Sequence, residues 1–300
     1  MKIRNFLAVS LSALLFAGCS TEKPDDGCVK VLMIGNSFSI SLMSNLPKVA
    51  ESLNVPLALT SLYIGGCSLE RHVDNLHHAG EEGFRPYKVN YSLRGKYVPQ
   101  ANANVTDMLN GETKYDIITI QQASHFSWRP GSYSPYGDEL VAAIRKAQPQ
   151  AKIYVQETWS YTPWDHRFKE WKIDQDEMYE KLRGAYAAFA GKYGFPVIKM
   201  GTAVQEWRKR LPVKYTDHSF GGDVVGGRFQ KPQDMFKRTA DNKWVANTDV
   251  FHLNEKGEYL QALVWAAKLF GSDVTRCEYR PDYVSESDAE LMKDIANGLK

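Results

Sequence analysis

The stretch that decides the fold lies near the N-terminus and reads VKVLMIGNSFSISLMSNL over residues 29–46. Residues 29–34 form an apolar run with one lysine, which is typical of a strand buried on both faces of a parallel sheet. Gly35 ends this run, and apolar residues then recur at helical spacing over residues 39–53. The stretch therefore predicts a strand that passes directly into a helix, with Ser37 at the turn between them.

The same alternation of strands and helices continues along the chain. Strands are predicted over 57–64, 117–120, 152–156 and 195–200, with a hairpin over 87–98; helices are predicted over 105–109, 138–147, 174–193, 203–210, 254–270 and 287–299. We expect one doubly wound α/β domain with a mostly parallel five-stranded sheet, in a three-layer α/β/α sandwich of the flavodoxin-like kind. The Gly-rich, aromatic segment 212–248 is too long for an ordinary connection, and we expect it to form a wall of the substrate site.

The first 18 residues have the features of an export signal. Lys2 and Arg4 precede a short apolar region, residues 6–16, which is followed by Ala-Gly-Cys ending at Cys19. Small residues before a cysteine predict a lipoprotein signal, so that Cys19 becomes a lipid-modified N-terminus; the alternative is an ordinary cleaved signal with a free cysteine. Residues 19–27 are then a tether and residues 28–300 the folded domain. We expect the protein to be exported and held at the cell envelope by its lipid anchor alone.

Charge and cysteine content exclude several classes of function. Without residues 1–18 the chain has 35 basic and 35 acidic residues, so a nucleic-acid-binding surface is not expected. Three cysteines remain after Cys19, namely Cys28, Cys67 and Cys277, so at least one thiol is free. The histidines at 72, 77 and 78 lack acidic or thiol partners at ligand spacing. We predict that they lie on a helix surface, and we expect no metal and no organic cofactor.

Two short motifs together contain the three side chains of nucleophilic ester chemistry. Ser37 ends the first strand, and Asp249-Val250-Phe251-His252 precedes the last strong helix of the core. An attacking hydroxyl needs a base to accept its proton and an acid to orient that base. We therefore predict Ser37 as nucleophile, His252 as base and Asp249 as orienting acid. Ser39 is a competing hydroxyl, but its place one step into the helix favours an N-cap.

The ends of the next two strands offer donors for an oxyanion. The carboxyl ends of parallel strands meet at one edge of a sheet, so Gly65-Gly66 and Gln121-Gln122 are expected close to Ser37. The backbone N–H groups of Ser37 and Gly66, and the side-chain amide of Gln122, suit an oxyanion hole. Spacing leaves Gln121 and His125 open as alternatives to Gln122.

These motifs resemble the blocks of the SGNH, or GDSL-type, hydrolase superfamily. Gly35-Asn36-Ser37-Phe38-Ser39 is similar to the first block, residues 65–70 to the second and residues 249–257 to the last, whereas Gln121-Gln122 stands where the superfamily usually has Gly-x-Asn. The chain looks most like a branch of secreted bacterial lipoproteins defined only as a domain of unknown function. The resemblance covers roughly residues 29–271 and implies hydrolysis of an ester.

The expected substrate is a small acyl ester, most simply an acetyl group on a carbohydrate. Glu157 and Trp159 follow the fourth strand and are candidate substrate-binding residues, because aromatic faces stack on sugar rings; ordinary loop packing is the alternative. Two other functions stay open at this point: a lipid or aryl esterase, and a non-catalytic glycan-binding lipoprotein with the same fold.

Overall fold

The computed structural model describes residues 27–211, 221–228 and 234–300. The expected signal peptide at 1–18, Cys19 and the tether up to residue 26 lie outside these residues, as do parts of segment 212–248. Among the helices of the described ranges, none combines the length and the apolar character needed to span a bilayer.

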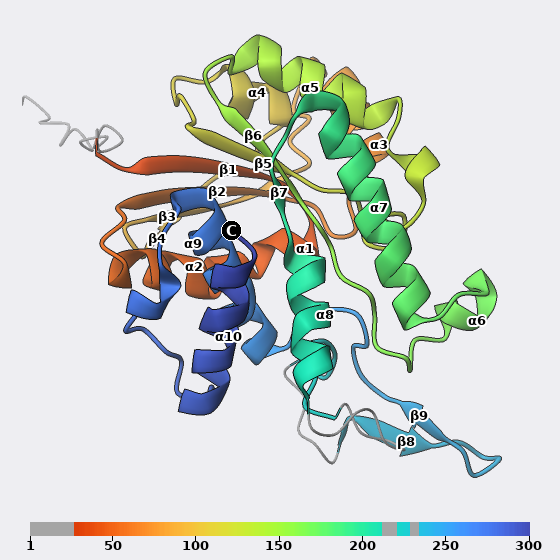
Figure 1. The fold of residues 1–300 in the computed structure, drawn as a ribbon. Coiled ribbons are helices and arrows are strands. Elements are labelled where there is room, and N and C mark those ends of the chain that lie inside the picture. The colour runs from red at the N-terminus through yellow and green to blue at the C-terminus, as the bar shows by residue number, and fades with distance from the viewer. Residues whose placement is uncertain (1–26, 212–220, 229–233) are drawn as a thin grey trace, which may run out of the picture.

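A seven-stranded sheet forms the centre of the molecule, in the order β4-β3-β2-β1-β5-β6-β7 (Figure 1). The strands are β1 (Val29–Gly35), β2 (Leu57–Tyr63), β3 (Lys88–Leu93), β4 (Lys96–Pro99), β5 (Ile117–Ile120), β6 (Lys152–Gln156) and β7 (Val197–Ile198). Five of them run parallel, as expected, while β3 and β4 pair antiparallel. The predicted count of five strands is two short, because the hairpin predicted over 87–98 pairs with β2 and extends the sheet.

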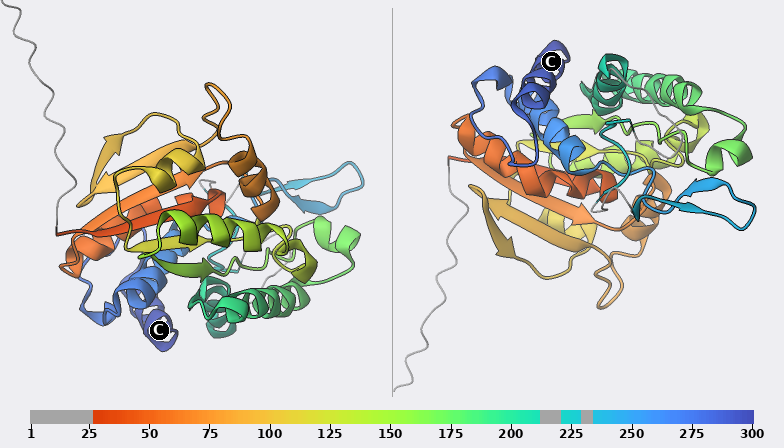
Figure 2. Two further views of the ribbon diagram at one scale, coloured as in Figure 1. Left: turned by 90° about the horizontal axis from the view of Figure 1, so that it is seen from above. Right: turned by 90° about the horizontal axis from the view of Figure 1, so that it is seen from below.

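Helices cover both faces of this sheet, which confirms the expected three layers (Figures 1 and 2). One face carries α3, α4 and α5; the other carries α2, α8, α9 and α10, and α7 packs along the β6–β7 edge. Their bounds are α1 (Ser37–Ile40), α2 (Leu42–Ser52), α3 (Leu69–His77), α4 (Val105–Asn110), α5 (Tyr136–Ala147), α6 (Arg167–Trp171), α7 (Gln175–Tyr193), α8 (Met200–Arg210), α9 (Glu255–Phe270) and α10 (Glu286–Gly298). A small hairpin, β8 (Phe236–Arg238) with β9 (Trp244–Ala246), projects from the body.

The central strand β1 determines where a site can form. Its residues 31–34 are at most 1 % exposed, because β2 and β5 flank it and helices cover both faces. The chain leaves β1 toward β2 on one side and later returns to β5 on the other, so β1 lies at the switch in strand order. In such sheets ligands bind beyond the carboxyl end of this strand, and Ser37 lies there.

Candidate active site

Ser37 is the first residue of α1, and Asn36 fixes the turn that presents it. The Asn36 side chain accepts a hydrogen bond from the Phe38 N–H at 3.0 Å and donates one to the Cys67 carbonyl at 2.9 Å. The first bond caps the short helix, and the second ties it to the turn that contains Gly66. A side chain at Gly35 would come within 2.3 Å of the Ser39 hydroxyl and would have to displace it, so glycine suits this tight exit from β1. The Ser39 hydroxyl donates to the Asn36 carbonyl and is buried.

The structure brings Ser37, His252 and Asp249 together in a hydrogen-bonded chain. His252 Nε2 lies 2.8 Å from Ser37 Oγ, and His252 Nδ1 makes a short contact with Asp249 Oδ2. A carboxylate accepts only, so Nδ1 carries the proton and Nε2 is left as the acceptor for the Ser37 hydroxyl. This is the arrangement in which a neutral imidazole can take the proton of a serine.

Asp249 is kept ionised by its hydrogen bonds. Its Oδ1 accepts the N–H groups of Phe251 and His252, each at 2.9 Å, while Oδ2 faces the imidazole. Burial alone would raise the pKa of Asp249, but the hydrogen bonds from His252 and the neighbouring backbone outweigh it and hold the pKa below its usual range.

Every backbone carbonyl from Asp249 to His252 accepts a hydrogen bond. The donors are, in order, Gly227 N at 2.9 Å, Thr162 N at 2.9 Å, Trp159 Nε1 at 2.8 Å and Gly226 N at 2.8 Å. Two separate parts of the chain, the segment after β6 and Gly226-Gly227, thus hold the acid and the base in place, as efficient proton transfer requires.

Two backbone N–H groups are placed to act as oxyanion donors. The N–H of Ser37 belongs to the open first turn of α1, and that of Gly66 belongs to a turn with φ +62°; neither has a hydrogen-bond acceptor within the described parts of the chain. Asn36 links these two turns through the Cys67 carbonyl. The positive φ at Gly66 explains why glycine is needed there.

The expectation for Gln122 is contradicted, because its amide is fully used elsewhere. Its Nε2 donates to the Ser132 carbonyl at 2.7 Å and to the Ser132 hydroxyl at 3.2 Å, and its Oε1 accepts from the N–H groups of Leu69 and Ala123. Gln122 therefore fastens the start of α3 to the turn at 130–132. It is not a free oxyanion donor.

Gln121 supports the turn that contains Asn36 and Ser37. Its Nε2 donates to Asn36 Oδ1 at 2.7 Å, and its Oε1 accepts a short hydrogen bond from Gln156. Gln156 and Gln261 both donate to the Phe38 carbonyl of α1, at 3.1 and 2.8 Å. These three glutamines and Asn36, all at most 3 % exposed, form a buried amide network. The sequence motifs did not predict a role for Gln156 or Gln261. Each is a glutamine in an otherwise apolar buried segment, and this could have indicated a buried hydrogen-bond network.

The nucleophile end of this site lies in a region that matches a protein family. A family model described as a domain of unknown function, DUF4886, matches residues 30–229. The chain belongs to the DUF4886 family. The match includes Ser37 and Gly66 and ends before Asp249. A search of curated proteins found no match.

Solved structures extend the likeness over most of this DUF4886 chain. A DUF4886 family protein from Bacteroides uniformis is 27 % identical, with a TM-score of 0.73 over 90 % of this chain and 94 % of that one. A proposed SGNH hydrolase from Slackia heliotrinireducens is 18 % identical, with a TM-score of 0.50 over 81 % of this chain and 99 % of that one. This DUF4886 protein therefore has the SGNH fold, as the sequence motifs predict.

The two predicted substrate-binding residues are buried away from solvent, which contradicts their expected role. Trp159 is fully buried and stacks on Phe38 with ring centroids 4.2 Å apart, and its indole N–H donates a hydrogen bond to the Phe251 carbonyl. Glu157 accepts from the N–H and hydroxyl of Thr202 at the start of α8, at 3.1 and 3.0 Å. Both residues therefore support the DUF4886 scaffold.

The histidines and cysteines of this protein form no candidate metal site in the described ranges. His72 is buried, contrary to the predicted surface position; its Nδ1 lies 2.8 Å from the Tyr87 hydroxyl and 3.5 Å from Cys67 Sγ. Burial lowers the pKa of His72 to about 3, so it is neutral. The thiols of Cys28, Cys67 and Cys277 are buried and unpaired.

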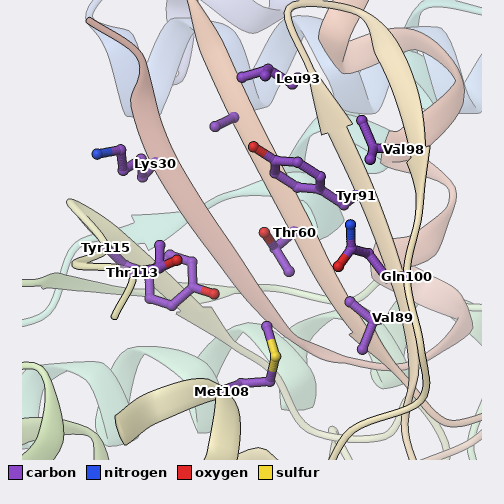
Figure 3. Close-up of a pocket in the computed structure, with 11 residues that line it drawn as sticks. Lys30, Thr60, Val89, Tyr91, Leu93, Val98, Gln100, Met108, Thr113 and Tyr115 are labelled. Atoms are coloured by element: carbon purple, nitrogen blue, oxygen red, sulfur yellow. The ribbon is translucent and has the colours of Figure 1, made fainter. Parts of the chain in front are cut away.

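A separate cavity of about 470 Å³ opens on the face formed by the first four strands (Figure 3). Thr60, Tyr91 and Met108 lie in it, and Lys30 and Tyr115 border it near the amino ends of β1 and β5. No residue of the Ser–His–Asp group lines this cavity. This cavity is therefore separate from the Ser37–His252–Asp249 group at the carboxyl edge of the sheet.

Proposed function

We propose that this protein is a serine esterase that hydrolyses a small acyl ester, most simply an acetyl group on a carbohydrate. The observation that carries the proposal is the continuous Ser37–His252–Asp249 hydrogen-bond chain at the switch point of an SGNH fold. The two unpaired N–H groups of Ser37 and Gly66 support it.

The proposed reaction starts with transfer of the Ser37 proton to His252 Nε2 as Ser37 Oγ attacks the ester carbonyl carbon. Asp249 stabilises the resulting imidazolium. The N–H groups of Ser37 and Gly66 stabilise the oxyanion, each donor being worth about 10²–10³ in rate in comparable sites. The C–O bond breaks, the alcohol leaves with the proton held by His252, and an acyl-serine remains.

The second half of the reaction restores the enzyme. His252 takes a proton from water, the hydroxide oxygen attacks the acyl carbon, and the carboxylic acid is released as Ser37 Oγ regains its proton. Export and lipid modification at Cys19 belong to the same proposal, and they would place the site at the cell envelope.

Substitution of Ser37 tests the proposal directly. We expect Ser37→Ala to lower p-nitrophenyl acetate turnover by about 10³-fold or more and to abolish labelling by a fluorophosphonate probe. Ser39→Ala is the matched control, because Ser39 is a buried hydroxyl in the same helix that does not contact His252. Unchanged turnover in Ser37→Ala would refute the proposal, and activity that rises with acyl-chain length would favour a lipid esterase.

A non-catalytic glycan-binding protein is the second candidate function. The hydrogen bonds made by the Gln122 side-chain amide favour it. This amide donates to Ser132 and that of Gln121 donates to Asn36, which leaves the two backbone N–H groups as candidate donors and none from the side chains of Gln121-Gln122. Failure of the fluorophosphonate probe to label the wild-type protein, combined with measurable binding to oligosaccharides, would support this candidate.

A further inference from the structure

A line of aromatic rings leads from the proposed catalytic histidine to the segments that follow β5 and β6, and Tyr161, in the middle of the line, is fully buried. The Phe251 ring lies 4.3 Å from the His252 ring, and Tyr161 lies 5.5 Å from Phe251. Trp171 of α6 lies 5.9 Å from Tyr161, and Trp128 lies 5.4 Å from Trp171. Phe251, Trp171 and Trp128 are partly exposed. Flat aromatic surfaces of this kind suit the apolar faces of sugar rings.

Two arginines lie over this line of rings. The guanidinium carbon of Arg167 is 4.4 Å from the centre of Tyr161 and 4.7 Å from that of Phe251. The guanidinium carbon of Arg129 is 4.6 Å from the centre of Trp128. Such stacking fixes the plane of each guanidinium and leaves its edge available for hydrogen bonding.

The arginines are only partly neutralised. Arg167 binds Asp165 through Nε at 2.8 Å and Nη2 at 2.5 Å, while its Nη1 has no partner among the described residues. The Arg129 guanidinium has no hydrogen-bond or ion-pair partner in the same ranges. Burial lowers the pKa of the neighbouring His125, and the nearby positive charges of Arg167 and Arg129 lower it further.

A hollow of about 540 Å³ adjoins the far end of the ring line. Trp128, Arg129 and Pro130 line one side of it, and α7 lines the other with Glu180 and Lys181. Glu180 is paired with Arg183 at 2.6 Å and Lys181 with Glu177 at 3.3 Å. Arg129 is therefore the cation there that is left to bind an anion, and the volume suits a ligand of one or two sugars.

We propose that this surface is a subsite for an anionic sugar, so that the ester substrate is an acidic glycan bearing a carboxylate or a sulfate. The inference rests on the proposed esterase function. The acyl group would lie at Ser37, the neighbouring sugars would stack along Phe251, Trp171 and Trp128, and Arg129 would bind the anionic group in a forked, charge-assisted contact.

Matched substrate pairs test this subsite. An acetylated uronic-acid oligosaccharide is compared with its carboxyl-reduced, uncharged counterpart, and an acetylated sulfated sugar with its unsulfated form. We expect the wild type to prefer at least one anionic member in kcat/KM by about 10-fold, the worth of one charge-assisted hydrogen bond. Preference for the carboxylate or for the sulfate identifies the anion. Equal kcat/KM within both pairs would overturn the proposal.

Arg129 variants locate the effect. Arg129→Gln is expected to bring the ratio of kcat/KM for the anionic substrate to kcat/KM for its uncharged counterpart close to one, mainly by raising KM for the anionic substrate. Arg129→Lys is expected to keep part of the preference. Arg145→Gln is the control, because Arg145 is an exposed arginine of α5 stacked at 5.2 Å on Tyr193 and Phe195, away from the site. The control should keep the wild-type ratio. A preference that survives in Arg129→Gln, at an unchanged melting temperature, would refute the subsite.

Failure of the esterase function gives a different result. In that case wild-type protein does not hydrolyse p-nitrophenyl acetate, and the subsite is tested by calorimetric binding of the unacetylated uronic-acid or sulfated oligosaccharide. We expect Kd to rise about 10-fold in Arg129→Gln. Equal Kd values in wild type and variant would overturn the subsite independently of the esterase result.

Discussion

At the scale of single residues, one carboxylate organises most of the proposed catalytic group. Asp249 uses Oδ1 to hold the backbone of Phe251 and His252, and Oδ2 to set the imidazole tautomer. An asparagine in its place could present an N–H to Nδ1, which would move the imidazole proton to Nε2, on the side of Ser37.

We therefore expect Asp249→Asn to lower kcat for a small acetyl ester by about 10²–10⁴-fold, as tautomer errors do in related triads. Steady-state kinetics with p-nitrophenyl acetate checks this. Asp241→Asn, in the exposed turn between β8 and β9, is the control. A loss of less than twofold in Asp249→Asn would show that this carboxylate does not orient the base.

Gly66 offers a second test at this scale, with a matched control. It has φ +62°, and a Cβ added there would meet no atom within 4 Å, so Gly66→Ala introduces backbone strain without a clash. We expect a loss of about 1 kcal/mol in unfolding free energy and a fall in kcat as the N–H rotates from its position. Gly83→Ala, with φ +74° and equal space, should lose the same stability at full activity. Equal activities of the two variants would argue against Gly66 as an oxyanion donor.

At the scale of elements, a buried ion pair holds the segment that supports the acid and the base. Arg208 of α8 binds Asp223 at 3.0 Å and the Ser160 hydroxyl at 2.7 Å, and the chain after Asp223 supplies Gly226 and Gly227 to the carbonyls of His252 and Asp249. The Asp223 side chain is fully buried and that of Arg208 is 6 % exposed.

Arg208→Met should accordingly lower the unfolding free energy by about 3–5 kcal/mol, because it removes an opposite charge that contacts the buried carboxylate of Asp223. Urea denaturation measures this. The double variant Arg208→Met/Asp223→Asn should recover part of the loss, since the buried negative charge is removed as well. If the unfolding free energy of Arg208→Met fell by less than about 1 kcal/mol, the Arg208–Asp223 ion pair would not hold this segment in place.

The buried strands could be predicted well because a strand covered on both faces consists mostly of apolar residues. Continuous apolar runs predicted β1, β2, β5 and β6 within a residue or so. The predicted strand at 195–200 is shorter in the structure, where only Val197 and Ile198 pair, because β7 lies at the sheet edge and α8 begins at Met200.

The errors at Gln122, Glu157 and Trp159 share one physical cause. The sequence predicts that Gln122, Glu157 and Trp159 lie at strand ends. It does not predict the direction in which each side chain points there. All three point into the scaffold and make hydrogen bonds with groups of other segments, 10, 45 and 92 residues away, namely Ser132, Thr202 and the Phe251 carbonyl. Trp128 and Trp171 belong to different segments of the chain, so the sequence did not show that their rings are neighbours.

At the scale of the whole molecule, Glu157 makes stability depend on pH. Burial raises its pKa to about 7, although hydrogen bonds from Thr202 oppose the rise. An unfolded glutamate has a pKa near 4.5. Between these values the folded protein keeps a proton that the unfolded chain has lost, so the contribution of this group to stability falls as pH rises from about 4.5 to about 7.

Glu157→Gln removes this titration and keeps an oxygen that can accept from Thr202. We expect its melting temperature to exceed that of the wild type most clearly near pH 8 and to vary less between pH 5 and 8. Glu81→Gln, on an exposed loop, should follow the wild-type profile. Parallel profiles of Glu157→Gln and wild type would mean that Glu157 titrates in the same range folded and unfolded.

The contact between Ser37 and His252 also has a consequence for biosynthesis. By the time Ile120 has been made, the chain contains β1 and both strands that flank it, so the nucleophile end of the site can form early. Its base lies 215 residues after the serine and is synthesised much later. A polypeptide that stopped before His252 would carry the serine without the base that deprotonates it, so we expect hydrolytic activity only after His252 has been synthesised and folded into place.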